Sequence, residues 1–168
     1  GGGLMYIPNP KESYTLILQA KILEAGSYGG FGLLFDTTAS DTSSQTDTGF
    51  IVQVDRGYAS GEIIIRPRLN GKELNPLYRF GVRFDEEGNL TLSGGIKDNQ
   101  NPWWTSEHEL KVIVDIENEA TNQKLISVYI DNTFLFEYTF TSSLFDESVQ
   151  DNLTGFRTWS GVDVAFYA

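Results

Sequence analysis

The chain contains no cysteine among its 168 residues. It can therefore form no disulfide, cysteine nucleophile, zinc–thiolate site or iron–sulfur cluster, and thiol-based redox chemistry is excluded. The absence does not assign a cellular compartment, because exported and cytosolic proteins alike can lack cysteine.

Basic residues are scarce as well: 12 Lys and Arg stand against 23 Asp and Glu, a formal net charge of −11. Such a charge repels polyanions, which argues against nucleic acid and anionic membranes as partners, although acidity also serves simple solubility. No apolar run approaches the roughly 20 residues that span a bilayer, so the sequence predicts no membrane insertion. Residues 1–13, which open with three glycines, are interpreted as a linker or tag remnant and lead-in to one domain over residues 14–168.

Histidine occurs once, at position 108, between Glu107 and Glu109. Neighbouring residues of a strand point to opposite faces, so these three side chains cannot form a catalytic triad or a two-histidine metal site. We expect His108 to be exposed.

Alternation of apolar and polar residues in short runs is the dominant pattern of the sequence. In Tyr14–Ile22 the residues on one face are Tyr14, Leu16, Leu18, Ala20 and Ile22. Ile17 is the one apolar residue on the opposite face. Similar runs cover residues 50–55, 62–68, 80–84, 90–93, 110–116, 125–130, 134–138 and 162–167. This period of two predicts about ten strands, and no segment has convincing helical spacing apart from a short turn at 143–151.

Turn residues connect these runs. Asn70-Gly71 and Asp131-Asn132 suit tight hairpins with positive φ, so the pairing is expected to be antiparallel. Residues 37–48 are almost entirely small or polar, which predicts one exposed loop. Many short strands without helices indicate an all-β fold, with a two-sheet antiparallel sandwich favoured over a barrel.

Six segments, taken in order, resemble a known family: YGGFGLLFD (28–36), GFIVQVDRGY (49–58), IIR (64–66) running into NGKE (70–73), KVIVD (111–115), YIDN (129–132) and TGFRTW (154–159). They are similar to the concanavalin-A-like, laminin-G-like jelly-roll modules of prepilin-type proteins, the minor pilins of type IV pili of Gram-positive bacteria. The resemblance implies an extracellular adhesin module that projects from a pilus and binds glycans or host surface glycoproteins. It also implies that an N-terminal pilin segment, not contained in this chain, contacts other pilin subunits.

The first candidate ligand-binding group lies on the polar side of two adjacent strands and comprises Gln53, Asp55, Arg66 and Arg68. Arginine and carboxylate side chains make charge-assisted hydrogen bonds to hydroxyl groups, so this group could hold a sugar on an exposed sheet face. The alternative is a cross-strand ion pair between Asp55 and Arg66 with a structural role.

The second candidate is the aromatic pair Trp103-Trp104, because an exposed indole ring can stack on a pyranose. The alternative is that these rings close the core at one end of the sandwich, since tryptophan is usually highly buried. Trp159, which belongs to one of the family-like segments, is expected to be structural.

Acidic residues suggest two further readings. Asp115, Glu117 and Glu119 would share one strand face, as the paired carboxylates of a glycosidase do, but a solvated strand end is much the favoured explanation. Calcium could be held by Asp36, Asp41 and Asp47, although their spacing matches no known loop. We therefore expect no metal site, no cofactor and no enzymatic activity.

The sequence thus favours a non-catalytic, extracellular glycan-binding module of a pilus-associated protein. A purely structural module that binds only partner subunits of a filament is the second hypothesis, and a glycosidase is the third. An exposed aromatic beside polar groups would favour the first, a broad apolar patch the second, and paired carboxylates in a cleft the third.

Overall fold

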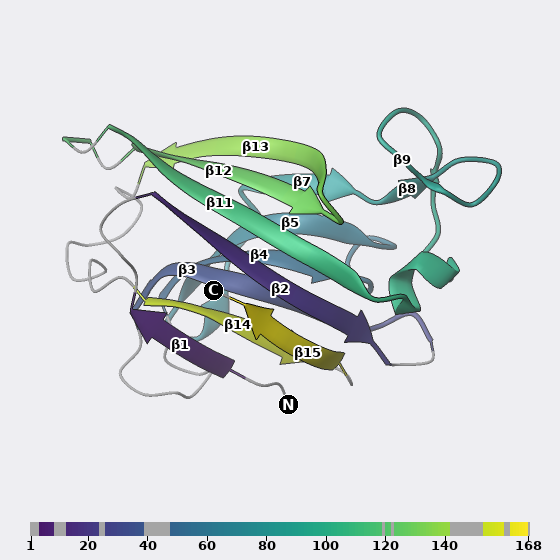
Figure 1. The fold of residues 1–168 in the computed structure, drawn as a ribbon, viewed down its shortest axis with the longest axis horizontal. Coiled ribbons are helices and arrows are strands. Elements are labelled where there is room, and N and C mark those ends of the chain that lie inside the picture. Colours follow the sequence, from purple (N-terminus) through teal and green to yellow (C-terminus); the bar gives the residue numbers. More distant parts are fainter. Residues whose placement is uncertain are drawn as a thin grey trace.

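A computed structural model gives the structure of the protein (Figure 1). It describes residues 4–8, 13–23, 26–38, 48–118, 120–121, 123–141, 153–159 and 162–167. For residues 4–8, 38, 153–155 and 162–167 the description covers the backbone only.

Two antiparallel sheets pack face to face, as the sequence predicts (Figure 1). The larger sheet has the order β1-β14-β3-β4-β5-β6, with β7 also pairing with β5. Its strands are β1 (Leu4–Pro8), β3 (Gly30–Thr38), β4 (Thr48–Asp55), β5 (Glu62–Leu69), β6 (Lys72–Glu73), β7 (Tyr78–Gly81) and β14 (Leu153–Trp159).

The smaller sheet has the order β13-β12-β11-β2-β15. Its strands are β2 (Tyr14–Ile22), β11 (His108–Asn118), β12 (Gln123–Ile130), β13 (Thr133–Thr141) and β15 (Val162–Tyr167). The fold is thus a two-sheet antiparallel β-sandwich, as the sequence predicts.

The core lies between the two sheets and is built by the predicted alternation. In β2 the buried residues Leu16 and Leu18 face the core, and in β11 Leu110 and Val112 do the same. On the larger sheet, the core side of β4 is apolar and aromatic, and the Phe50 ring lies 4.5 Å from that of Phe140 on β13. Burial of these side chains away from water is the main stabilising contribution to such a sandwich.

The larger sheet departs from the prediction in one respect: β4 and β5 are buried on both faces along nearly their whole length. Apolar Ile51 and Ile64 point away from the core but are fully buried. The candidate functional site lies on this outward surface of β4 and β5.

Both predicted hairpin turns are confirmed. Asn70 and Gly71 connect β5 to β6 with φ of 50° and 77°, and Asp131 and Asn132 connect β12 to β13 with φ of 51° and 64°. Two consecutive positive-φ residues give the turn whose twist matches that of paired strands.

The polar segment 37–48 is shorter as a loop than predicted. Thr37 is fully buried and Thr48 nearly so, and both residues belong to strands. The Thr48 hydroxyl also accepts the N–H of Asn70 at 2.9 Å. Thr38 ends β3 and pairs with Thr48, whereas residues 39–47 and the helical turn expected at 143–151 lie outside the described residues.

A small third sheet stands at one end of the sandwich, next to a 3-10 helix (Figure 1). The sheet comprises β8 (Arg83–Phe84), β9 (Leu90–Thr91) and β10 (Ile96–Lys97), and the helix η1 spans Pro102–Thr105. Asn101 caps η1 by accepting the N–H of Trp103 at 2.9 Å, and Pro102 suits the first helical position. The run predicted as one strand at 80–84 is split here between β7 and β8.

Within residues 1–13, expected to be a lead-in, residues 4–8 form β1 and pair with β14 in an antiparallel register. Leu4–Pro8 is apolar at its first four positions and ends in proline, so it has no alternation of polar and apolar residues and the sequence did not predict a strand there. The described part of the chain contains no helix long and apolar enough to cross a membrane.

Candidate functional site

The outward surface of the larger sheet carries a group of polar side chains, here called the polar face: Gln53, Asp55, Arg66, Arg68, Glu73 and Arg157. Strand register brings them together. Arg157 of β14 lies opposite Gly32 of β3, which lies opposite Gln53 of β4. In the next row Ile51 of β4 lies opposite Arg66 of β5. Opposed residues of neighbouring strands share a face, so all of these side chains point away from the core.

Three of the four predicted residues of the polar face are buried, with 2% of Gln53, 8% of Arg66 and 1% of Arg68 exposed. The expectation that they would be exposed is wrong for these three, whereas Asp55 is half-buried. For the two arginines the reason is that Glu73, from the neighbouring strand β6, bonds to both of them across the sheet.

Asp55 and Arg66 do not form the ion pair considered above. Register places Asp55 opposite Glu62, and its carboxylate accepts the Gln53 amide at 2.7 Å and the backbone N–H of Gly57 at 3.1 Å. Burial raises the pKa of Asp55, and these two hydrogen bonds and the charge of Arg66 only partly oppose the effect.

The Glu73 carboxylate is the centre of the charged network. It accepts Arg66 Nη1 at 2.7 Å, Arg157 Nη1 at 3.2 Å and Arg68 Nη1 at 3.5 Å. Three guanidinium groups thus share one carboxylate through single contacts.

A second carboxylate on the same sheet is paired in a different way. Glu62 accepts Arg79 Nε at 2.7 Å and Nη2 at 2.9 Å, the two-pronged geometry that is strongest for this pair, and it also accepts Lys97 Nζ. Burial raises the pKa of Glu62, but the bonds and charges of Arg79 and Lys97 outweigh it, so the net pKa is lowered.

Three polar atoms of the polar face are buried without any hydrogen-bond partner: Gln53 Oε1, Arg66 Nε and Arg157 Nε. Buried polar atoms are nearly always hydrogen-bonded, because leaving one unpaired costs about 1–3 kcal/mol. All three atoms lie on one surface of one sheet, so a ligand bound at that surface could supply the hydrogen-bond partners that they lack.

Aromatic rings flank this surface. The indole of Trp159 lies over Gly30, where a Cβ atom would come within 2.1 Å of its Cζ2, and Gly30 in turn lies opposite Asp55. On the other side, the Tyr58 ring has the guanidinium groups of Arg66 and Arg79 each 5.3 Å from its centroid. Trp159, expected to be structural, is therefore half-buried beside the polar face.

The Trp103-Trp104 pair does not form an exposed platform. Only 1% of Trp104 is exposed, and its Nε1 donates to the Asp98 carbonyl at 3.1 Å. Trp103 is half-buried and stacks on the His108 ring with centroids 4.1 Å apart. The alternative reading, in which the pair closes one end of the core, describes Trp104 correctly.

His108 is buried, and the expectation of exposure is wrong. It begins β11 on the same face as Leu110, and its Nδ1 and Nε2 lie 2.6 Å from Asp131 Oδ2 and from the Trp103 carbonyl. Both ring nitrogens therefore face oxygen atoms that belong to other parts of the chain.

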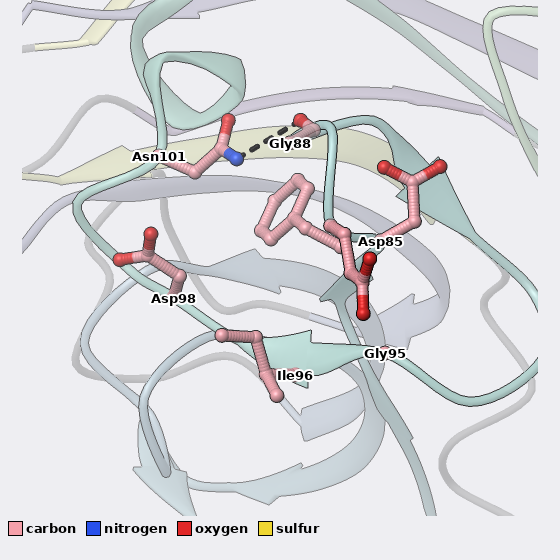
Figure 2. A pocket seen from close by; sticks show the side chains of 8 residues that line it. Asp85, Gly88, Gly95, Ile96, Asp98 and Asn101 are labelled. Atoms are coloured by element: carbon pink, nitrogen blue, oxygen red, sulfur yellow. Dashed lines mark hydrogen bonds between the residues drawn. The ribbon is translucent and has the colours of Figure 1, made fainter.

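An open pocket lies beside the Trp pair, in the small end sheet (Figure 2). It encloses about 570 Å³ and is lined by Phe84, Asp85, Glu86, Gly88, Gly95, Ile96, Asp98 and Asn101. Asn101 donates to the Gly88 carbonyl at 3.0 Å and so ties the two sides together. Sequence patterns did not indicate this pocket, because its lining comes from turns and from two-residue strands that are too short to show a period.

The remaining carboxylate predictions find little support in geometry. Asp115 is half-buried and Glu117 is exposed near the end of β11, where Glu117 accepts the Gln123 amide at 3.3 Å, and Glu119 lies outside the described residues. Asp36 is buried and paired with Lys124, while Asp41 and Asp47 are not described. No group of three His, Asp or Glu residues suited to a metal ion occurs in the described ranges.

No protein-family model matches the chain, and no curated protein matches its sequence. Solved structures do match. The Emp46p carbohydrate recognition domain is 12% identical with a TM-score of 0.60, covering 98% of this chain and 74% of that one. Sheep galectin-11, solved with glycerol, is 12% identical with a TM-score of 0.50, covering 98% and 92%. Alginate lyase Aly36B, at 10% identity and a TM-score of 0.44 over 96% and 72%, is too distant to bear on activity. The chain therefore has the fold of lectin-like carbohydrate-recognition domains.

Proposed function

We propose that this protein is a non-catalytic glycan-binding module and that the glycan binds at the polar face. One observation carries the proposal: buried Gln53 Oε1 and Arg66 Nε lack hydrogen-bond partners on a surface flanked by aromatic rings. A sugar offers hydroxyl groups that both donate and accept, so it can supply the missing partner to an amide oxygen and to a guanidinium N–H.

The aromatic rings complete the chemistry. A pyranose ring has apolar C–H faces, and half-buried Tyr58 and Trp159 offer ring surfaces beside the polar groups. Combined polar and aromatic contacts of this kind are the usual composition of a small-ligand site. Among the described carboxylates here, Glu62 and Glu73 are bonded to arginines and Asp55 accepts the Gln53 amide, an arrangement that favours binding over acid–base catalysis.

The wider setting follows from the six family-like segments. We propose that the module is displayed outside the cell on a type IV pilus as part of a minor pilin, where glycan binding would serve adhesion. The lectin-like fold supports the binding role, and the pilus assignment rests on the sequence resemblance alone.

A glycan array, probed with the purified protein in calcium and again in chelator, tests the proposal. We expect binding to a related set of glycans, unchanged by the chelator, because the described residues contain no suitable cluster of metal ligands. Tyr58→Ala should weaken binding about tenfold, which corresponds to about 1.4 kcal/mol. Tyr129→Ala is the matched control, because Tyr129 is also a half-buried ring with a cation above it, 4.5 Å away, but on the smaller sheet. Absence of any glycan signal at high protein concentration, or equal losses in the two variants, would contradict the proposal.

A further inference from the structure

The two carboxylate–arginine clusters of the larger sheet differ in how completely their arginines are used. Arg79 bonds Glu62 through both Nε and Nη2, at 2.7 and 2.9 Å. Arg66 and Arg157 each reach Glu73 through Nη1 alone, and the Nε of each is buried and unpaired. The cluster around Glu73 therefore has two guanidinium Nε–H donors that the Glu73 carboxylate does not engage and that a further anion could bind.

Guanidinium geometry indicates what kind of anion this is. The five N–H donors of arginine form a rigid fork that fits a planar carboxylate or a sulfate with two parallel hydrogen bonds. Glu73 uses one prong of Arg66 and one of Arg157. An oxyanion entering from outside could engage Nε and a terminal nitrogen of the same arginine.

Glu73 is also the most easily displaced member of the cluster. Its side chain is 40% exposed, against 10% for Arg66 and 22% for Arg157. It belongs to β6, a strand of only two residues that follows the Asn70-Gly71 turn at the margin of the sheet. Arg66 and Gln53, by contrast, project from long strands inside the sheet.

Gln53 extends the site from an anion-binding position to a sugar-binding one. Its amide nitrogen is engaged by Asp55 at 2.7 Å, which leaves Oε1, buried and unpaired, as an acceptor for a hydroxyl group. A ligand with an acid group and a neighbouring hydroxyl would satisfy Arg66 Nε and Gln53 Oε1 together.

We propose that the glycan bound at the polar face is acidic, and that its carboxylate or sulfate binds Arg66 and Arg157 in place of the Glu73 carboxylate. This inference rests on the proposed function and names its substrate class. The net charge of −11 repels anions at long range, so recognition of the acid group is local and depends on these two arginines. Glu73 acts as an internal substitute for the ligand and holds the arginines in place until the ligand arrives.

The test uses sialylated, glucuronylated and sulfated oligosaccharides, each beside its uncharged parent, with titration calorimetry on the strongest pair. We expect the acidic member to bind at least tenfold more tightly than its parent. Glu73→Gln removes the competing charge and should strengthen binding of the acidic member about three- to tenfold while leaving the neutral parent within twofold. Arg157→Gln should abolish most of the preference.

Glu137→Gln is the matched control, because it also removes one negative charge, but from an exposed position on β13 of the opposite sheet. It should leave both affinities unchanged. Equal binding of acidic and neutral members by the wild type, or equal effects of Glu73→Gln and Glu137→Gln, would overturn the inference while the proposed function stands. Absence of binding to both members would overturn the proposed function with it. Thermal unfolding of each variant verifies that the fold is retained.

Discussion

Replacement of Trp104 by alanine is the sharpest test of how the end of the sandwich is built. Its ring is almost completely buried and packs against Gly61, where a Cβ atom would come within 2.3 Å of Cζ2. Its Nε1 holds the Asp98 carbonyl at 3.1 Å. Truncation would therefore open a cavity in the core and leave a carbonyl oxygen without its donor.

The expected loss follows from these two effects. Truncating a buried aromatic side chain to alanine costs about 3–5 kcal/mol, and the lost hydrogen bond adds about 1 kcal/mol. The total of about 4–6 kcal/mol is a large fraction of the 5–15 kcal/mol typical of a domain. For a chain of this length, each kcal/mol lowers Tm by about 2–4 °C, so Tm should fall by about 8–24 °C.

Urea unfolding followed by circular dichroism, together with a thermal scan, measures this loss. Trp103→Ala is the comparison, because Trp103 is only half-buried, and we expect it to lose less than half as much free energy of unfolding. A Trp104→Ala loss below about 1 kcal/mol, or a larger loss for Trp103→Ala, would refute the placement of Trp104 as the buried member of the pair.

Two further predictions concern titratable groups. Burial raises the pKa of Asp55 above its ordinary value of 3.8, so the folded state holds its proton more tightly than the unfolded state, and the free energy of unfolding should fall as pH rises from about 4 through the folded pKa. Asp55→Asn should remove that part of the fall in urea titrations run at stepped pH, and an unchanged pH slope would contradict the assignment. His108→Gln cannot reach both Asp131 and the Trp103 carbonyl, so it should lower the free energy of unfolding by about 1–3 kcal/mol, whereas a loss within 0.5 kcal/mol by the same assay would show that these contacts are weak.

The sequence was informative wherever burial follows a simple period. Strands such as Tyr14–Ile22 alternate cleanly because one face meets the core and the other does not, and the paired positive-φ turns at 70–71 and 131–132 have few other solutions. The class of fold and most strands could therefore be predicted.

The state of the polar face could not be predicted, because alternation says which side of a strand a residue is on but not whether that side is covered. Gln53 and Arg66 point outward as expected and are still buried, and Glu73 of β6 bonds both Arg66 and Arg157 of β14. Those partners are 84 positions apart in the chain, a separation that no local pattern reports.

His108 illustrates the same limit at a single position. Its two glutamate neighbours suggested a solvated strand, whereas its partners are Asp131, 23 positions away, and the backbone of a short helix whose start depends on the Asn101 cap. Periodicity does not identify such capped single turns.

The order of the strands also determines how the chain reaches its native state. β14, close to the end of the described chain, pairs with β1 and β3, while β11 pairs with β2, so residues 4 and 157 become partners, as do residues 16 and 112. Pairings between such distant segments slow folding, because a long loop must close before any contact compensates for its lost entropy. A ribosome-bound chain that lacks β14 would leave β3 without one of its two neighbours. Folding should therefore be slow, because β3 cannot complete its pairing before the chain has been synthesised as far as β14.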